Sequence, residues 1–86
     1  MANYSIALTH TAEKQLRKLP KKELPRIVQA LEMLSFTPLP QGRRKLSGHS
    51  NTFRVRVGIY RIIYEILGQR LIIKILKIGH RKDVYR

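Results

Sequence analysis

The sequence predicts one α+β domain over residues 1–86, with helices packed on one face of a single sheet. Residues 53 to 78 hold three runs in which apolar side chains alternate with other residues, and short turns separate the runs. Residues 12 to 34 instead carry apolar side chains at helical spacing. Strand side chains alternate with a period of two, whereas helical side chains recur every three to four residues. The predicted order is therefore an N-terminal strand, a helical hairpin, then a three-stranded antiparallel meander.

The N-terminal half supplies the first strand and the helical hairpin. Residues 4–8 (YSIAL) alternate and predict a short edge strand, and Thr9 or Thr11 is suited to cap the helix that follows. Pro20 ends this helix, and residues 22–34 form a second helix with a clear apolar face. The tight turn between the two helices predicts that both lie across the same face of the sheet.

Strict alternation assigns each strand side chain to one face of the sheet. In the first run, Arg54 and Arg56 lie on the side opposite the apolar residues. In the third run, Ile73 and Ile75 face one way and Ile78 faces the other. Because the third run is apolar on both sides, we expect its strand to be central in the sheet.

The chain is strongly basic, with 18 Lys+Arg, 5 Asp+Glu and a net charge of +13. Residues 43–86 carry twelve of the basic residues and two of the acidic ones. Such a surplus repels itself in the folded state, so it predicts a polyanionic or acidic partner. A generally basic surface and a membrane-binding surface are the alternatives. The membrane alternative is weaker, because the charge lies on strands and not on an amphipathic helix.

The residues that are absent disfavour several classes of function. The chain has no cysteine, no paired carboxylates, no His/Asp/Glu cluster at metal spacing and no phosphate loop, so no metal and no cofactor is expected. No apolar run approaches the roughly 18 residues of a membrane span, and no signal-peptide pattern begins the chain, so the expected location is cytoplasmic. The remaining chemistry uses Arg, Lys, His and Tyr, a set suited to a phosphodiester.

Three segments carry a resemblance to a known family: residues 53–57 (FRVRV), 58–65 (GIYRIIYE) and 77–86 (KIGHRKDVYR). With these segments the chain resembles the RelE branch of the RelE/ParE toxin superfamily over nearly its whole length. The resemblance implies the RelE-like microbial RNase fold and the toxin component of a type II toxin-antitoxin system. It implies a ribosome-dependent endoribonuclease that cleaves mRNA by 2′-hydroxyl attack on the adjacent phosphate, without a metal. It also implies inhibition by a cognate antitoxin within a hetero-oligomer.

The resemblance implies catalytic roles for three residues of the second half. Arg61 occupies the position of the family's phosphate-clamping arginine, and a guanidinium binds a phosphoryl group through two hydrogen bonds. Arg81 matches a second arginine, proposed to assist the leaving group. Tyr85 matches a tyrosine that orients or stacks near the cleaved nucleotide.

Other positions depart from the family pattern. Well-studied members carry lysines where this chain has Arg54 and Arg56, and an arginine supplies charge but cannot serve as a general base. His80 occupies a position that is often basic, and a histidine is suited to proton transfer near neutral pH, so His80 joins the predicted catalytic set. The predicted RNA-binding residues are Arg43, Arg44, Lys45, Arg54 and Arg56.

Two other functions remain open at this point. A ParE-type toxin shares the fold and inhibits DNA gyrase by protein binding, without nuclease activity. A plain RNA-binding domain would show salt-sensitive binding and no turnover. For either toxin, we expect an antitoxin with an acidic segment that folds on binding. In the nuclease it would compete with RNA, by covering the basic strands or by displacing the C-terminal tail around Tyr85.

Overall fold

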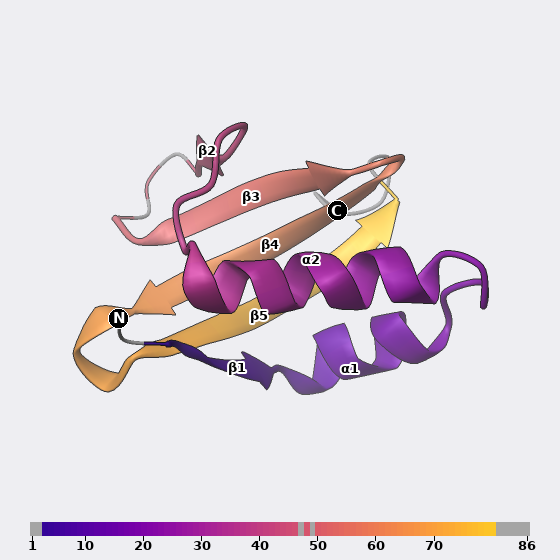
Figure 1. Cartoon of the computed structure of the whole chain (residues 1–86), viewed down its shortest axis with the longest axis horizontal. Helices are drawn as coiled ribbons and strands as arrows, with labels where there is room; N and C mark the ends of the chain where they lie inside the picture. Colours follow the sequence, from indigo (N-terminus) through magenta and orange to yellow (C-terminus); the bar gives the residue numbers. More distant parts are fainter. Residues whose placement is uncertain (1–2, 47, 49, 81–86) are drawn as a thin grey trace.

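A computed structural model of the chain describes residues 3–46, 48 and 50–80 and confirms the α+β class. The elements are β1 (Ser5–Leu8), α1 (His10–Arg17), α2 (Leu24–Phe36), β2 (Arg44–Lys45), β3 (Thr52–Val57), β4 (Tyr60–Leu67), the short 3-10 helix η1 (Gly68–Arg70) and β5 (Ile72–His80). Among the described residues the strands form one sheet in the order β1-β5-β4-β3-β2, with both helices on one face (Figure 1).

The two ends of the sheet differ in how well the sequence predicted them. β1 runs parallel to β5, with Ser5 opposite Ile72, which confirms the predicted edge strand. β5 lies inside the sheet between β1 and β4, although the middle strand is β4. β2 was not predicted; its two residues pair antiparallel with β3. A strand of this length has no alternation to detect, so its existence depends on the tertiary contact with β3.

The helical hairpin follows the sequence prediction closely. α1 begins after Thr9, whose hydroxyl accepts the backbone N–H of Ala12 at 3.0 Å, so Thr9 is the cap. α2 has Pro25 in its first turn, where a missing N–H is tolerated. α2 begins two residues later than predicted and ends two residues further on, at Phe36. None of the helices in the described part of the chain is long and apolar enough to cross a membrane.

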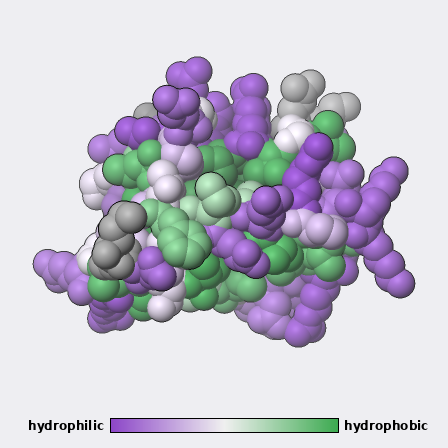
Figure 2. Space-filling view, viewed as in Figure 1, coloured by the Kyte–Doolittle hydropathy of each residue, from purple (hydrophilic) through white to green (hydrophobic). Residues whose placement is uncertain are grey.

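The hydrophobic core lies between the helices and the sheet. Ile27 and Leu31 on α2 are buried against the apolar side chains of β3, β4 and β5. Tyr64 is fully buried, stacks on Phe53 with 5.9 Å between ring centroids, and donates its hydroxyl to the Pro38 carbonyl at 2.8 Å. Figure 2 shows hydrophilic side chains around the rim of the helix-covered side, with hydrophobic surface between them.

A bulge in β5 changes which side chains reach the core. Tyr64 on β4 pairs with Ile75, but the neighbouring Ile63 pairs with Lys77, so one residue of β5 has no partner. The extra residue restarts the alternation of the strand. Ile78 is therefore in the core, with 1% of its surface exposed, and the prediction that it faces away from Ile75 is wrong. Strict alternation fails here because it assumes an uninterrupted ladder.

Candidate nucleic-acid interface

The face of the sheet turned away from the helices carries a cluster of basic side chains. Cross-strand partners project to the same side of a sheet, so the strand register determines which residues share this face. Two neighbouring cross-strand rows supply the cluster: Arg44, Arg54, Ile63 and Lys77, and then Arg56, Arg61 and Gly79. The charged members are called the basic face below: Arg44, Arg54, Arg56, Arg61 and Lys77.

Arg61 lies on the middle strand of this face, between Arg56 on β3 and Gly79 on β5. The side chains of Arg61 and Arg54 are half-buried and their Nε atoms are shielded from solvent, whereas Arg56 is exposed. A half-buried guanidinium has less rotamer freedom and lies in a lower effective dielectric than an exposed one. Its attraction for a phosphate is therefore stronger. Arg61 and Arg54 are accordingly better placed than Arg56 to hold an anion.

The basic run before β3 is divided between the two sides of the sheet. Arg44 pairs with Arg54 and joins the basic face, whereas Lys45 pairs with Phe53 on the helix-covered side. Arg43 precedes β2, and its Nη1 donates to two backbone carbonyls of the preceding loop, each at 3.3 Å. Of the three predicted RNA-binding residues in this run, the register therefore places one on the basic face.

A pocket of about 540 Å³ extends the positive surface toward the edge of the sheet. Arg43, Arg44 and Arg56 are among the residues that line it, and the described lining residues include no carboxylate. Several cations without a counter-charge favour an anion at this place. The pocket lies beside the row that contains Arg61, so a chain of phosphates could follow the surface from one to the other.

Tyr64 supports the loop that carries Arg43. Burial raises the pKa of the Tyr64 hydroxyl from 10.0 to about 12, and the positive charge of Arg43 opposes this shift. The hydroxyl is therefore protonated at neutral pH and donates to the Pro38 carbonyl at 2.8 Å. This hydrogen bond joins the core to the loop between α2 and β2.

His80 lies on the face of the sheet opposite to Arg61. It is the cross-strand partner of Tyr60, and the two rings meet at 74° with 6.4 Å between their centroids. Both rings line a groove of about 320 Å³ together with residues such as Lys18 and Pro20 from the end of α1 and the turn after it. The structure does not bring His80 and Arg61 together, and proton transfer by His80 stays a prediction.

Two of the predicted catalytic residues, Arg81 and Tyr85, lie outside the described residues. Their roles stay predictions. Within residues 3–46, 48 and 50–80, no group of three His, Cys, Asp or Glu side chains is placed to hold a metal ion. The described part of the site therefore offers the chemistry of arginine and lysine.

Lys77 is the member of the basic face that the sequence prediction missed. Strict alternation puts it beside Ile73 and Ile75 on the core side, where an unpaired ammonium group would be costly. That conflict was the available signal, because a lysine in the apolar row of a strand indicates an inserted residue. The bulge resolves the conflict by placing Lys77 opposite Ile63, on the basic face.

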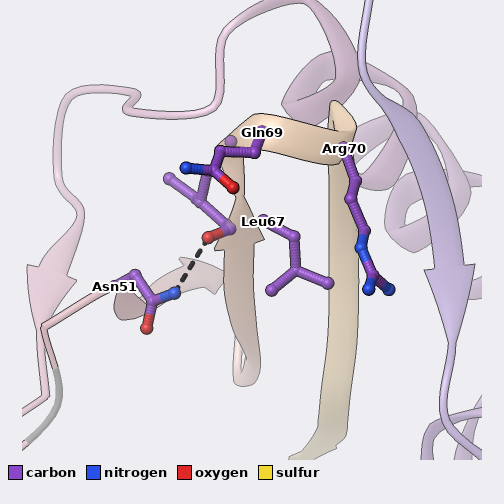
Figure 3. Close-up of a pocket in the computed structure, with 6 residues that line it drawn as sticks. Asn51, Leu67, Gln69 and Arg70 are labelled. Atoms are coloured by element: carbon purple, nitrogen blue, oxygen red, sulfur yellow. Dashed lines mark hydrogen bonds between the residues drawn. The ribbon is translucent and has the colours of Figure 1, made fainter.

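A separate pocket of about 480 Å³ surrounds the link between β4 and β5 (Figure 3). At its rim the Asn51 side-chain amide donates to the Ile66 carbonyl at 3.0 Å, which ties the start of β3 to the end of β4. Arg70 is the charged residue among the described residues that line it. This pocket lies about 20 Å along β4 from Arg61, at about 3.3 Å per residue, and we assign it no role in the basic face.

Comparison with known proteins identifies the family. Residues 6–85 match the family described as the ParE toxin of type II toxin-antitoxin system, parDE. The chain belongs to this family of toxins, within the RelE/ParE superfamily that the sequence resemblance indicated.

Similar relatives carry RelE-type names. Toxin RelG of Mycobacterium tuberculosis is 40% identical over 87 residues, which cover 96% of this chain and 97% of RelG. The toxin-antitoxin complex RelBE2 of the same organism matches with a TM-score of 0.83 and 34% identity, over 96% of this chain and 97% of that one. The archaeal RelE-RelB complex of Pyrococcus horikoshii OT3 matches with a TM-score of 0.81 and 30% identity, over 95% of this chain and 99% of that one. These matches confirm the predicted RelE-like fold.

Proposed function

We propose that this protein is a RelE-type toxin that cleaves mRNA on the ribosome and is inhibited by a cognate antitoxin. One observation carries the proposal: Arg61 is a half-buried arginine on the middle strand, surrounded by other cations of the basic face. The similarity to toxins named RelG and RelE supports it. So does the net charge of +13, because a ribosome with its mRNA is a large polyanion. Such a toxin acts in the cytoplasm.

The proposed reaction is a transesterification within the RNA chain. The 2′-oxygen bonds to the adjacent phosphorus, the bond from phosphorus to O5′ breaks, and the products are a 2′,3′-cyclic phosphate and a 5′-hydroxyl. The proton lost by the 2′-hydroxyl is balanced by the proton gained at O5′. Arg61 binds the non-bridging oxygens and stabilises the extra negative charge of the pentacovalent state. Arg54 and Arg56 neutralise neighbouring charge, since neither guanidinium can release its proton.

The resemblance also supports roles for residues near the C-terminus. We propose that Arg81 stabilises charge on the leaving oxygen and that Tyr85 stacks on a nucleotide beside the cut. His80 needs a test of its own, because its ring packs against Tyr60 on the helix-covered side.

An antitoxin of the RelB type is the proposed partner. The two similar solved structures described above are complexes of a RelE protein with RelB. The surplus of positive charge favours an acidic segment on the partner, by electrostatic complementarity. We propose that this segment covers the basic face and therefore competes with RNA. A complex that leaves Arg61 and Arg54 accessible would contradict this mechanism of inhibition.

A purified translation reaction tests the proposed function. The wild-type chain is added to a defined mRNA with and without ribosomes, and cuts are mapped by primer extension. We expect cuts in phase with the codons, only when ribosomes are present, and none after the antitoxin is added. The description of the matched family names the ParE toxin. Inhibition of gyrase, the activity of ParE-type toxins, is therefore the second candidate function. Intact mRNA together with inhibited supercoiling by purified gyrase would favour that function instead.

A further inference from the structure

The bulge in β5 turns Lys77 onto the basic face. The strand keeps its regular pairing as far as Ile75, opposite Tyr64, and pairing resumes with Lys77 opposite Ile63. Without the extra residue, Lys77 would project into the core on the same side as Ile73. Bulges occur preferentially next to active sites, where they redirect a side chain. Here the redirected side chain is half-buried and cationic.

Lys77 is a neighbour of Arg61 on this face. Arg61 pairs with Gly79, two residues further along β5, so Lys77 is the diagonal cross-strand neighbour of Arg61. Diagonal neighbours lie about 7–8 Å apart, within the reach of long side chains. The residue directly opposite Arg61 is a glycine, which adds no side chain between the two cations. One phosphodiester group can therefore contact both the guanidinium and the ammonium group.

Chemistry separates Lys77 from the arginines around it. A guanidinium does not release its proton in a protein, whereas a lysine ammonium group has three N–H bonds and can donate one. Lys77 is the lysine of the basic face, so it is the member of that face suited to donate a proton. Lys74 also projects from β5 on the side away from the helices, but it pairs with Glu65 and lies outside the basic face, further from Arg61.

We propose that Lys77 is the general acid of the cleavage reaction, an inference that rests on the proposed function. As the bond from phosphorus to O5′ breaks, its electron pair stays on O5′, which takes a proton from Nζ of Lys77. The proton of the attacking 2′-hydroxyl passes to water, and the neutral lysine is reprotonated from solvent. Arg61 holds the phosphate throughout and supplies charge, not protons.

Two mRNAs that differ in one atom test this assignment. One has the normal O5′ at the mapped cut, and the other has sulfur there, as a 5′-bridging phosphorothiolate. A thiolate leaves without a proton, so the sulfur substrate does not need a general acid. We expect Lys77→Ala to slow single-turnover cleavage of the oxygen substrate about 100-fold or more and to regain the wild-type rate with sulfur. Lys77→Arg should behave in the same way, because arginine keeps the charge but not the transferable proton.

Two further variants serve as controls in the same reactions. Lys74→Ala removes a lysine of the same strand and should leave both rates unchanged. Arg61→Ala should be slow with both substrates, because phosphate stabilisation does not depend on the leaving atom. A Lys77→Arg variant as fast as wild type would overturn the proposal, and so would a Lys77→Ala defect that sulfur does not relieve. If wild type cleaves neither mRNA, the proposed function itself fails, and the general acid with it.

Discussion

The rings of Tyr60 and His80 meet edge to face, with 6.4 Å between their centroids, on the side of the sheet that the helices cover. Arg61 follows Tyr60 directly, and alternation along β4 sends its side chain to the other side. His80 and Arg61, the residue proposed to bind phosphate, are therefore separated by the sheet itself.

This separation predicts the behaviour of a His80→Gln variant. We expect ribosome-dependent cleavage at the wild-type rate, because the imidazole does not share a face with Arg61. Single-turnover primer extension measures the rate, and the melting temperature of the variant controls for altered folding. A loss as large as that of Arg61→Ala, in a variant that folds normally, would show that the imidazole takes part in the reaction.

Binding of RNA should depend on salt through the arginines of the basic face. Each phosphate contact that is lost reduces the slope of log K against log salt concentration by about 0.7 for a single strand. We therefore expect Arg44→Ala to lower both the affinity for an RNA oligonucleotide and this slope. Lys21→Ala is the matched control, because Lys21 is an exposed cation in the turn between the helices. Equal effects of the two changes would mean that the chain binds RNA by net charge alone.

Gln15 completes the ladder of β5 beyond the end of β1. Its Oε1 accepts the backbone N–H of Ile78 at 2.7 Å. The pairing of β5 with β1 ends before this point, at Ile75 opposite Leu8. Gln15→Ala leaves that N–H without a partner next to a buried side chain. We expect the free energy of unfolding to fall by about 1–3 kcal/mol, measured by urea denaturation. Gln29→Ala, at an exposed position of α2, should change it little, and equal losses would contradict the role of Gln15.

Tyr64 should make stability depend on alkaline pH. The pKa of its hydroxyl is about 12 in the folded chain against 10.0 ordinarily, so its contribution to the free energy of unfolding is fully present below pH 10. Between the two values the unfolded tyrosine loses its proton first, and the contribution of Tyr64 to the free energy of unfolding falls by about 3 kcal/mol in total. Tyr64→Phe removes this term and also the hydrogen bond to Pro38, which stabilises by about 1 kcal/mol. Urea denaturation at pH 9 and pH 11.5 should therefore show a stability advantage of wild type that shrinks with pH. A constant advantage would be the contrary result.

The sequence predicted those parts of the molecule that depend on regular spacing. Period-two alternation found β1, β3, β4 and β5, and the apolar stripe found α2 because Ile27 and its neighbours recur at helical spacing. Alternation also placed Arg54 and Arg61 on their strands, and the family resemblance gave those positions a chemical meaning. These features depend on residues that are close together in the sequence, so the sequence alone is enough to predict them.

What the sequence did not predict depends on contacts between distant residues. The bulge in β5 allows both Ile75 and Ile78 to reach the core, and the resulting shift in register moves Lys77 onto the basic face. The same shift puts His80 beside Tyr60, although the two are far apart in the sequence. β2 forms only because Arg44 and its neighbour meet β3. None of these contacts produces a periodic pattern in the sequence. The local signal is Lys77, which strict alternation assigns to the apolar side of its strand.

The most direct test of the nuclease proposal compares Arg61→Ala with Arg70→Ala on ribosomes that carry a defined mRNA. Arg70 is an exposed arginine at the opposite end of β4, so its loss removes the same charge without touching the basic face. Single-turnover cleavage should fall about 100- to 1,000-fold for Arg61→Ala, the range seen when one transition-state donor is removed. Arg70→Ala should match wild type. Equal rates for wild type and Arg61→Ala would contradict a phosphate clamp at Arg61.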